Sequence, residues 1–307
     1  MTPGRARSVA VGSLRVALGL ALLVALFWYS EPEKIWALVR GARPGLLLLI
    51  PLLSLVRIWI MAVRFGVLVG PTHAIDRVTL VRQFLVGAYA NNFLPTAIGG
   101  DALRIAMLRQ ESVSGHLAVS LVLLERAIGF AALVAISAAG AFIVDVPEAI
   151  RAIIAVLAVG TFVAILASRF LLRVPERVRW SRLVPPDLQL ARGTLALAFA
   201  WSLVLQLCSI GLSWAVGLAL GADVPAGFYL ALVPLVWVVT MLPVTIGGVG
   251  LREAAFVYLF GSAGVSSELS LGISLGTYAG LLFTGLVGAL VLARSIARGR
   301  GIRLRER

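Results

Sequence analysis

Six long apolar runs alternate with short polar segments along the chain, and each run is long enough to form a membrane-spanning helix. Such a helix needs about 20 predominantly apolar residues to cross a hydrocarbon core of about 30 Å. The candidate spans are residues 11–29, 45–69, 117–143, 149–172, 193–220 and 270–293. The pattern predicts an all-α polytopic integral membrane protein with an uncleaved first span.

Two further apolar regions, 82–109 and 226–262, do not fit a single helix because each is interrupted near its middle by Leu-Pro-x-x-Ile-Gly-Gly. Interrupted helices occur in membranes where the freed backbone is buried in protein or lines a cavity. Each region is therefore expected to be either a re-entrant helical hairpin or two short helices that meet at the break, giving eight membrane segments in all. The residues that form the breaks are Asn92, Pro95, Gly99 and Gly100 in the first region and Pro243, Gly247 and Gly248 in the second.

The two breaks are copies of one motif. Leu-Pro, Ile-Gly-Gly and Leu-Arg recur with identical internal spacing, so that Pro95 returns as Pro243 and Arg104 as Arg252, both 148 positions later. We expect a single transmembrane domain, residues 1–307, with repeat halves at about 45–143 and 193–293. A duplication retained only for packing is the alternative, but packing alone does not require an arginine at the same place in both copies.

Composition excludes a soluble globule, because 60% of the residues are hydrophobic, 13% are charged and the mean hydropathy is +1.01. The net charge of +13 comes almost entirely from arginines at the ends of apolar runs. Arginines in such positions determine membrane orientation. No basic soluble module is present that would bind nucleic acid.

Basic residues in short loops predict the orientation, because cytoplasmic loops of membrane proteins are enriched in Lys and Arg. The N-terminus, the loop 169–192 and the basic tail 294–307 are arginine-rich, whereas three loops on the opposite side contain neither Lys nor Arg: 145–148, 221–227 and 261–268. Both termini are therefore expected in the cytoplasm, with the chain in the inner (cytoplasmic) membrane. The loop 31–43 is the exception, because it is expected outside and carries Lys34, Arg40 and Arg43.

In this topology the first broken region leaves from and returns to the cytoplasmic side, and the second leaves from and returns to the outer side. Three full spans separate them, so the two regions enter the membrane from opposite faces. The chain is therefore predicted to be an inverted-topology repeat. Such repeats are typical of transporters, whose substrates bind near the midplane where broken helices of the two halves meet.

Charged residues inside the apolar segments need a compensating interaction, because each costs roughly 2.5 to 3.5 kcal/mol at the centre of a membrane helix. Arg57 lies too deep in its span to reach the headgroups, whereas Arg64 is expected either to extend toward them or to remain in the protein. Glu125 and Arg126 diverge by about 100° on their helix and are expected to face partners from other segments. For Glu125 the candidate partners are Arg57, Arg104 and Arg252, and such a pair also has a purely structural interpretation, fixing helix register.

The repeated motif has the properties of an anion site. Paired glycines expose backbone N–H groups, the half-helix that follows directs its positive dipole end toward the break, and a nearby arginine supplies a bidentate donor for phosphate. We predict that Arg57, Arg104 and Arg252 bind a lipid phosphate, while Asp101, Glu125, Arg126 and Glu253 line and gate the cavity. Asp101 and Glu253 are alternatively expected to cap the half-helices or to titrate and couple protons to transport. Asn91 and Asn92 are expected to line the cavity or to satisfy the broken backbone.

Signals for catalysis or a cofactor are weak. His73 and His116 are isolated, and the single cysteine, Cys208, lies in an apolar run and excludes a multi-cysteine metal site. No nucleophile elbow, zinc-protease motif or P-loop is present. We expect no metal, no cofactor and no enzymatic activity, and an intramembrane transferase or hydrolase lacks a recognisable nucleophile and base.

Taken in order, the motifs resemble the lysylphosphatidylglycerol synthase transmembrane region, also called the flippase-like domain family. The resemblance rests on Asn92-Phe93-Leu94-Pro95, Gly99-Gly100-Asp101, Arg104, Glu125-Arg126, Leu242-Pro243, Ile246-Gly247-Gly248 and Gly250-Leu251-Arg252-Glu253, and covers about residues 10–295. In bifunctional members this region is the lipid flippase, and a C-terminal cytosolic domain aminoacylates phosphatidylglycerol. The chain ends at Arg307 without that domain, so the resemblance implies lipid translocation and argues against lysyltransferase activity.

Two classes of function follow from these observations. The first is a flippase that moves an anionic phospholipid or a polyprenyl-phosphate-linked lipid between leaflets. The second is a membrane accessory protein that holds a lipid for a partner, such as an envelope glycosyltransferase or a lipid-modifying enzyme, without transporting it. In both classes the ligand is an anionic membrane lipid.

Overall fold

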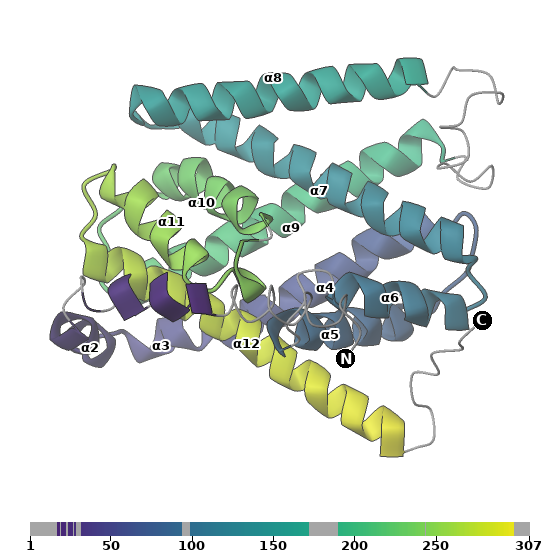
Figure 1. The fold of residues 1–307 in the computed structure, drawn as a ribbon, viewed down its shortest axis with the longest axis horizontal. Coiled ribbons are helices and arrows are strands. Elements are labelled where there is room, and N and C mark those ends of the chain that lie inside the picture. Colours follow the sequence, from purple (N-terminus) through teal and green to yellow (C-terminus); the bar gives the residue numbers. More distant parts are fainter. Residues whose placement is uncertain are drawn as a thin grey trace, which may run out of the picture.

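The computed structural model describes residues 32–93, 99–171, 190–242 and 244–297, together with isolated helical positions between residues 17 and 28. Within these residues every regular element is a helix (Figure 1). The elements are α2 (Pro32–Arg40), α3 (Pro44–Leu47), α4 (Leu49–Val69), α5 (Arg77–Phe93), α6 (Gly99–Gln110), α7 (Gly115–Ile143), α8 (Glu148–Leu171), α9 (Arg192–Ala219), α10 (Ala226–Thr240), the short 3-10 turn η2 (Ile246–Gly248), α11 (Leu251–Gly261) and α12 (Ser267–Ala297).

Five of the predicted spans are confirmed as helices long and apolar enough to cross a membrane. They are Pro44–Val69, Gly115–Ile143, Glu148–Ala167, Arg192–Ala219 and Ser267–Ala297. The sixth predicted span, 11–29, lies outside the described residues apart from the isolated helical positions. The chain is therefore an all-helical, multi-pass membrane protein.

Each interrupted region forms two short helices, as the Pro and Gly residues predict. With 17, 12, 15 and 11 residues, helices α5, α6, α10 and α11 are about 26, 18, 23 and 17 Å long at 1.5 Å per residue. None of them reaches the thickness of about 30 Å that a full crossing needs. Helix α5 packs against α6, and α10 packs against α11.

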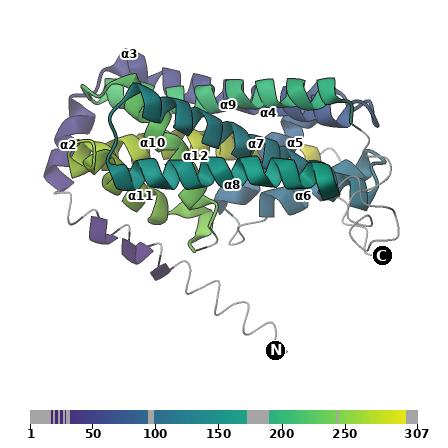
Figure 2. The same cartoon turned by 90° about the horizontal axis from the view of Figure 1, so that it is seen from above.

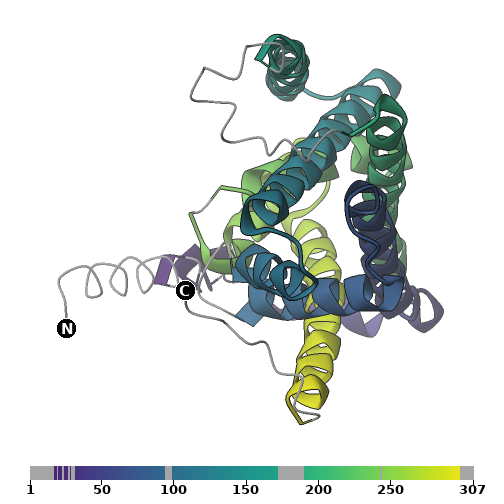
Figure 3. The ribbon, with the colours of Figure 1, turned by 90° about the vertical axis from the view of Figure 1, so that its right-hand side faces the viewer.

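Three helix pairs make the most extensive contacts in the described residues: α5 with α12, α7 with α10, and α4 with α9. Helices α4 and α9 lie side by side along one edge of the molecule (Figures 2 and 3). Helix α8 packs mainly against α7 and lies at the periphery (Figures 1 and 3). Its apolar side chains are mostly exposed, which suits a helix surrounded by lipid.

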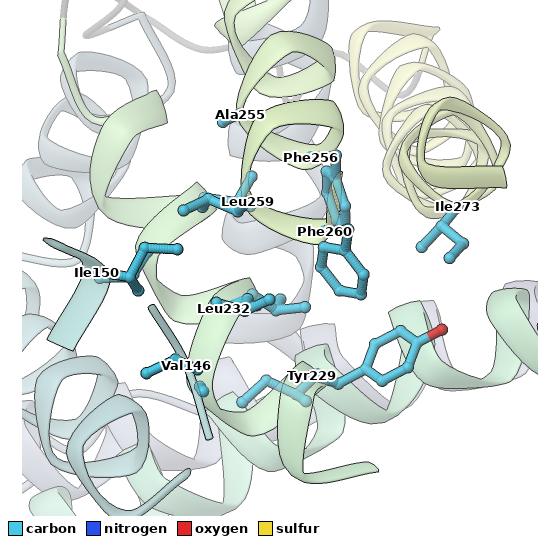
Figure 4. Close-up of a cluster of buried hydrophobic side chains, with 14 of the residues drawn as sticks. Val146, Ile150, Tyr229, Leu232, Ala255, Phe256, Leu259, Phe260 and Ile273 are labelled. Carbon is cyan, nitrogen blue, oxygen red and sulfur yellow. The ribbon is translucent and has the colours of Figure 1, made fainter. Parts of the chain in front are cut away.

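Two large apolar clusters form most of the core of the described residues, and each draws mainly on a different part of the chain. One joins α4 to α7 around Phe65 and Phe84, whose rings meet edge to face at 6.0 Å. The other joins α10, α11 and α12 around Tyr229, Phe256 and Phe260 (Figure 4). The charged residues of the repeated motif lie beside these clusters, so aromatic packing limits their access to water.

Two glycines determine how closely the best-packed pairs approach. A Cβ added at Gly140 would lie 2.7 Å from the carbonyl carbon of Leu230, and one added at Gly288 would lie 2.6 Å from that of Leu85. Backbone atoms cannot give way as a flexible side chain can. Glycine is therefore required where α7 crosses α10 and where α12 crosses α5.

The variant Gly288→Ala should destabilise the protein, because the added methyl group meets the α5 backbone and overpacking of this kind costs about 1–3 kcal/mol. The matched control is Gly160→Ala in α8, where an added Cβ meets nothing within 4 Å. Thermal unfolding in a mild detergent should show a lower midpoint for Gly288→Ala and an unchanged or higher one for Gly160→Ala. Equal midpoints for the two variants would show that the crossing is not tight.

Candidate functional site

A single buried carboxylate in the middle of α7 joins three helices. Glu125 is 2% exposed and accepts hydrogen bonds from two guanidinium groups. Arg64 Nη2 from α4 lies 2.5 Å from Glu125 Oε1, and Arg104 Nη2 from α6 lies 2.7 Å from Glu125 Oε2. Both oxygens of Glu125 are thus engaged, each by a different helix.

Arg64 extends this contact to a fourth helix. Its Nη1 donates to Ser202 Oγ of α9 at 3.2 Å. Gly129 of α7 leaves room for the guanidinium, since a Cβ at that position would lie 3.2 Å from Arg64 Nη1. Gln206 of α9 donates from Nε2 to the carbonyl of Gly129 at 3.3 Å. Helices α4, α7 and α9 therefore share one polar contact inside an apolar surround.

Arg104 is held between the carboxylate and two aromatic rings. Its guanidinium carbon lies 3.9 Å from the ring centroid of Phe84 and 4.8 Å from that of Phe65. Cation–π contacts of this kind strengthen when water is excluded. The side chain is 8% exposed, and its Nε is buried without a hydrogen-bond partner among the described residues.

A second, more accessible ion pair adjoins the first. Arg126 Nε donates to Asp101 Oδ2 at 2.6 Å, and Asp101 Oδ1 also lies 3.9 Å from Arg104 Nη1. The Arg126 side chain is 49% exposed, whereas that of Asp101 is 12% exposed. We refer to Arg64, Asp101, Arg104, Glu125 and Arg126 as the Glu125 cluster. Its three arginines outnumber its two carboxylates, which leaves one positive charge in excess.

The Glu125 cluster resolves the alternatives that the sequence left open for these residues. Glu125 pairs with Arg104, one of its three candidate partners, and also with Arg64. Extension of Arg64 to the headgroups is wrong, because the residue is 5% exposed and bound to Glu125. Glu125 and Arg126 each pair with a residue from another segment, as predicted, and both have a partner on α6: Arg104 for Glu125 and Asp101 for Arg126. Among the described residues, no ion pair or hydrogen bond connects Arg57 with the cluster, and Arg57 Nε is buried without a hydrogen-bond partner.

Asparagine side chains satisfy the polar groups around the first break. Asn91 Oδ1 accepts from the backbone N–H of Gly100 at 3.0 Å, and Asn92 Nδ2 donates to the carbonyl of Leu281 in α12 at 2.8 Å. A side chain at Gly100 would overlap the Asn91 amide, which explains the glycine. The carboxylate of Asp101, in the first turn of α6, accepts a hydrogen bond from Arg126, and its predicted capping role stays a prediction because the residues before Gly99 lie outside the described part of the chain. Pro95 lies outside the described residues.

The second copy of the motif builds a different site. Arg252 and Glu253 are 2% and 1% exposed and pair with each other, with Arg252 Nη2 lying 2.5 Å from Glu253 Oε1. The Arg252 guanidinium carbon lies 3.9 Å from the ring centroid of Tyr278, and Ser274 Oγ donates to Glu253 Oε1 at 3.3 Å. We refer to these four residues as the Arg252 cluster. Its arginine is neutralised locally, on the same helix, rather than by another helix.

The glycines of the second break are required by the backbone. Gly247, Gly248 and Gly250 have φ values of 62°, 74° and 81°, which L side chains rarely adopt. The N–H of Gly250 donates to Glu253 Oε2 at 2.6 Å, so the predicted capping of α11 by Glu253 is confirmed. Pro243 lies outside the described residues.

The two breaks approach each other, although the two clusters remain separate. A Cβ built on Gly247 would lie 3.6 Å from the backbone oxygen of Asn91, so η2 lies against the end of α5. Within the described part of the chain, no hydrogen bond or ion pair connects Arg104 with Arg252. The same residues contain no group of three or more His, Cys, Asp or Glu side chains that could hold a metal ion.

Glu125→Gln should destabilise the protein strongly, because it leaves two buried guanidinium groups without their shared counter-charge. Removing one partner of a buried ion pair costs about 3–5 kcal/mol. Asp145→Asn provides the control, since Asp145 pairs with Arg151 at the surface with side-chain exposures of 98% and 52%. Thermal unfolding should show a large loss for Glu125→Gln and none for Asp145→Asn. A wild-type midpoint for Glu125→Gln would mean that Glu125 does not hold the helices together.

Comparison with known proteins identifies the family of the chain. The chain is 27% identical over 104 residues to the UPF0104 membrane protein PH1989 of Pyrococcus horikoshii, a match that covers 33% of this chain and 31% of that relative. The match therefore spans about a third of that protein's length. The family model for the lysylphosphatidylglycerol synthase TM region matches residues 16–288, which include every helix described above from α2 to α11 and most of α12. The chain belongs to the lysylphosphatidylglycerol synthase transmembrane region family.

Proposed function

We propose that the protein translocates an anionic lipid, either a phospholipid or a polyprenyl-phosphate-linked lipid, between the leaflets of the inner membrane. The observation that carries this proposal is the positive charge left in excess in the Glu125 cluster, beside a break in a short membrane helix. A buried charge in a membrane segment is costly and generally marks a substrate pathway. A lipid phosphate is the counter-charge that such a pathway would accept.

Internal symmetry supports the transport assignment. An offset of 148 residues relates the helices α4, α5, α6 and α7 to α9, α10, α11 and α12 in the same order. The packing obeys the same relation, since the pair α5 and α12 corresponds to the pair α10 and α7. Gly140 and Gly288, the two close-approach glycines, are also 148 residues apart. We infer two structurally equivalent repeat halves, about 45–143 and 193–293.

The number of long helices supports opposite orientations for the two halves. From the start of α4 to the start of α9 the chain passes through the three long helices α4, α7 and α8 and the paired short helices α5 and α6. If the short pair is a re-entrant hairpin, three crossings separate the halves and the second is inverted. With both termini in the cytoplasm, α5 and α6 would enter from the cytoplasmic side, and α10 and α11 from the outside.

Because the arginines of the Glu125 cluster are paired with carboxylates, a lipid phosphate would bind by replacing a carboxylate. A phosphate can enter the Glu125 cluster through Arg126, whose side chain is half exposed, and then exchange for a carboxylate on Arg104. Arginine binds phosphate and carboxylate with the same planar fork, so the exchange conserves hydrogen bonds. Arg57 would provide further positive charge along the route, Arg252 would do so only if its pair with Glu253 opened, and the glycines of the two breaks would allow the short helices to move.

A lipid-holding accessory protein is the second candidate. It is favoured by the carboxylates of both clusters, all of which are already bound to an arginine. In that case the sites would stay closed and the protein would present a lipid to a membrane enzyme without moving it across. Both candidates are non-enzymatic and differ in one observable, the transfer of lipid between leaflets.

Purified protein in sealed vesicles should transfer a fluorescent anionic phospholipid between leaflets, and Arg126→Gln should reduce the rate by about tenfold or more, because a charge-assisted contact contributes about 1.5–3 kcal/mol. Arg151→Gln removes the same charge from the exposed Asp145 pair and serves as the control. Arg104→Ala should abolish transfer, provided that the variant still purifies as a folded species. A wild-type rate equal to that of protein-free vesicles, across several anionic lipids, would contradict the flippase and favour the accessory protein.

A further inference from the structure

A polar cavity opens at one end of the molecule, outside both clusters. It has a volume of about 440 Å³ and lies where the beginning of α5 meets the ends of α6 and α12. The charged and amide side chains that line it include Arg82, Gln83, Glu111 and Arg294. Its volume is in the range of small-molecule binding sites. The arginine-rich ends of these helices place it on the side expected to face the cytoplasm.

Gln83 adds an amide to the polar lining of the cavity. The residue is 4% exposed and lines the cavity. A primary amide offers two N–H donors and a carbonyl acceptor, so it can hydrogen-bond to polar groups of a ligand.

The charges around Gln83 favour an anion. Arg82 and Arg294 outnumber Glu111, and none of the three forms an ion pair with another described residue. Arginine supplies planar, bidentate recognition of phosphate. Glu111 can accept a hydrogen bond from a hydroxyl or amino group elsewhere on the same ligand.

The equivalent positions in the second half show that the fold does not require these polar residues. At the offset of 148, Arg82 corresponds to Leu230, Gln83 to Ala231, Glu111 to Leu259 and Arg294 to Val146. All four counterparts belong to, or pack against, the apolar cluster that fills the opposite end of the molecule, where Val146 and Leu259 are labelled in Figure 4. The place that holds the polar, open cavity in one half is filled by apolar, packed side chains in the other half.

Exposed apolar side chains connect the cavity with the lipid phase. Leu286 and Leu290 share a face of α12 with Arg294 and are 56% and 62% exposed, and Val78, one turn before Arg82, is 56% exposed. A lipid whose headgroup occupied the cavity would have its acyl chains along these residues. A soluble phosphate ester would gain nothing from them.

We propose that this cavity binds the phosphate-bearing headgroup of a lipid from the leaflet on its own side of the membrane. Arg82 and Arg294 hold the phosphate, and Gln83 hydrogen-bonds to a polar group of the same headgroup. This inference rests on the proposed function, because the cavity would be the place where the transported lipid first binds. Met107 lines the cavity one turn from Arg104 on the same helix, so the headgroup would lie next to the Glu125 cluster.

Binding of fluorescent phosphatidylglycerol to the purified protein in neutral mixed micelles tests the proposal. The double variant Arg82→Gln and Arg294→Gln should bind at least about tenfold more weakly than wild type, because two charge-assisted contacts are lost. Both arginines are exposed, so the fold should be retained, and an unchanged thermal midpoint verifies this. Arg151→Gln is the control with an equivalent charge loss at a remote, exposed site, and its affinity should be unchanged.

Two results would overturn the proposal. Wild-type affinity in the double variant would show that the lipid binds elsewhere, and full competition by glycerol 3-phosphate would assign the cavity to soluble phosphate esters. Gln83→Leu, which removes the amide from the cavity lining, should also weaken binding without lowering the thermal midpoint. If the wild-type protein bound the lipid in an Arg82-dependent way but did not transfer it between leaflets, only the proposed flippase function would be contradicted. The experiments therefore distinguish failure of the flippase proposal from failure of the cavity proposal.

Discussion

The structure depends on one carboxylate shared between two arginines in an apolar environment. Glu125 engages Arg64 on α4 and Arg104 on α6, and Arg64 reaches α9 through Ser202. An unpaired charge is too costly at this depth, so these helices must meet around Glu125. The interactions that place the arginines of the candidate site are therefore the same ones that hold the first short helix pair against the long helices.

The sequence predicted the helices well, because the length of an apolar run and the positions of Pro and Gly act locally. It predicted Glu125 and Arg104 as partners among alternatives, but not Arg64. Hydropathy indicates how deep a side chain lies but not which side chains surround it. Arg57 and Arg64 are seven residues apart and share one helical face, so the pattern alone does not show which of them meets Glu125. The hydrogen bond from the Gly100 N–H to the Asn91 side chain could not be predicted from the sequence either, because it depends on how closely the two ends of the break approach each other.

The two proposed repeat halves share one order of helices and use their charges differently. Arg104 is neutralised by a neighbouring helix, whereas Arg252 is neutralised by the adjacent residue, Glu253, which also caps α11. The polar cavity beside α5 has an apolar, packed counterpart beside α10. A substrate moving through the molecule would therefore meet an exchangeable cluster and an open cavity at one end, and a closed apolar cluster at the other.

The central claim is that the two short helix pairs enter the membrane from opposite faces and meet beside the buried arginines. Single cysteines at Glu111 and Ser262, introduced with Cys208→Ser, mark the outer ends of α6 and α11. Labelling with a membrane-impermeant maleimide in sealed, oriented vesicles should modify the cysteine at Glu111 only from the cytoplasmic side and the one at Ser262 only from the opposite side. Labelling of both from the same side would contradict the inverted arrangement and the transport route built on it.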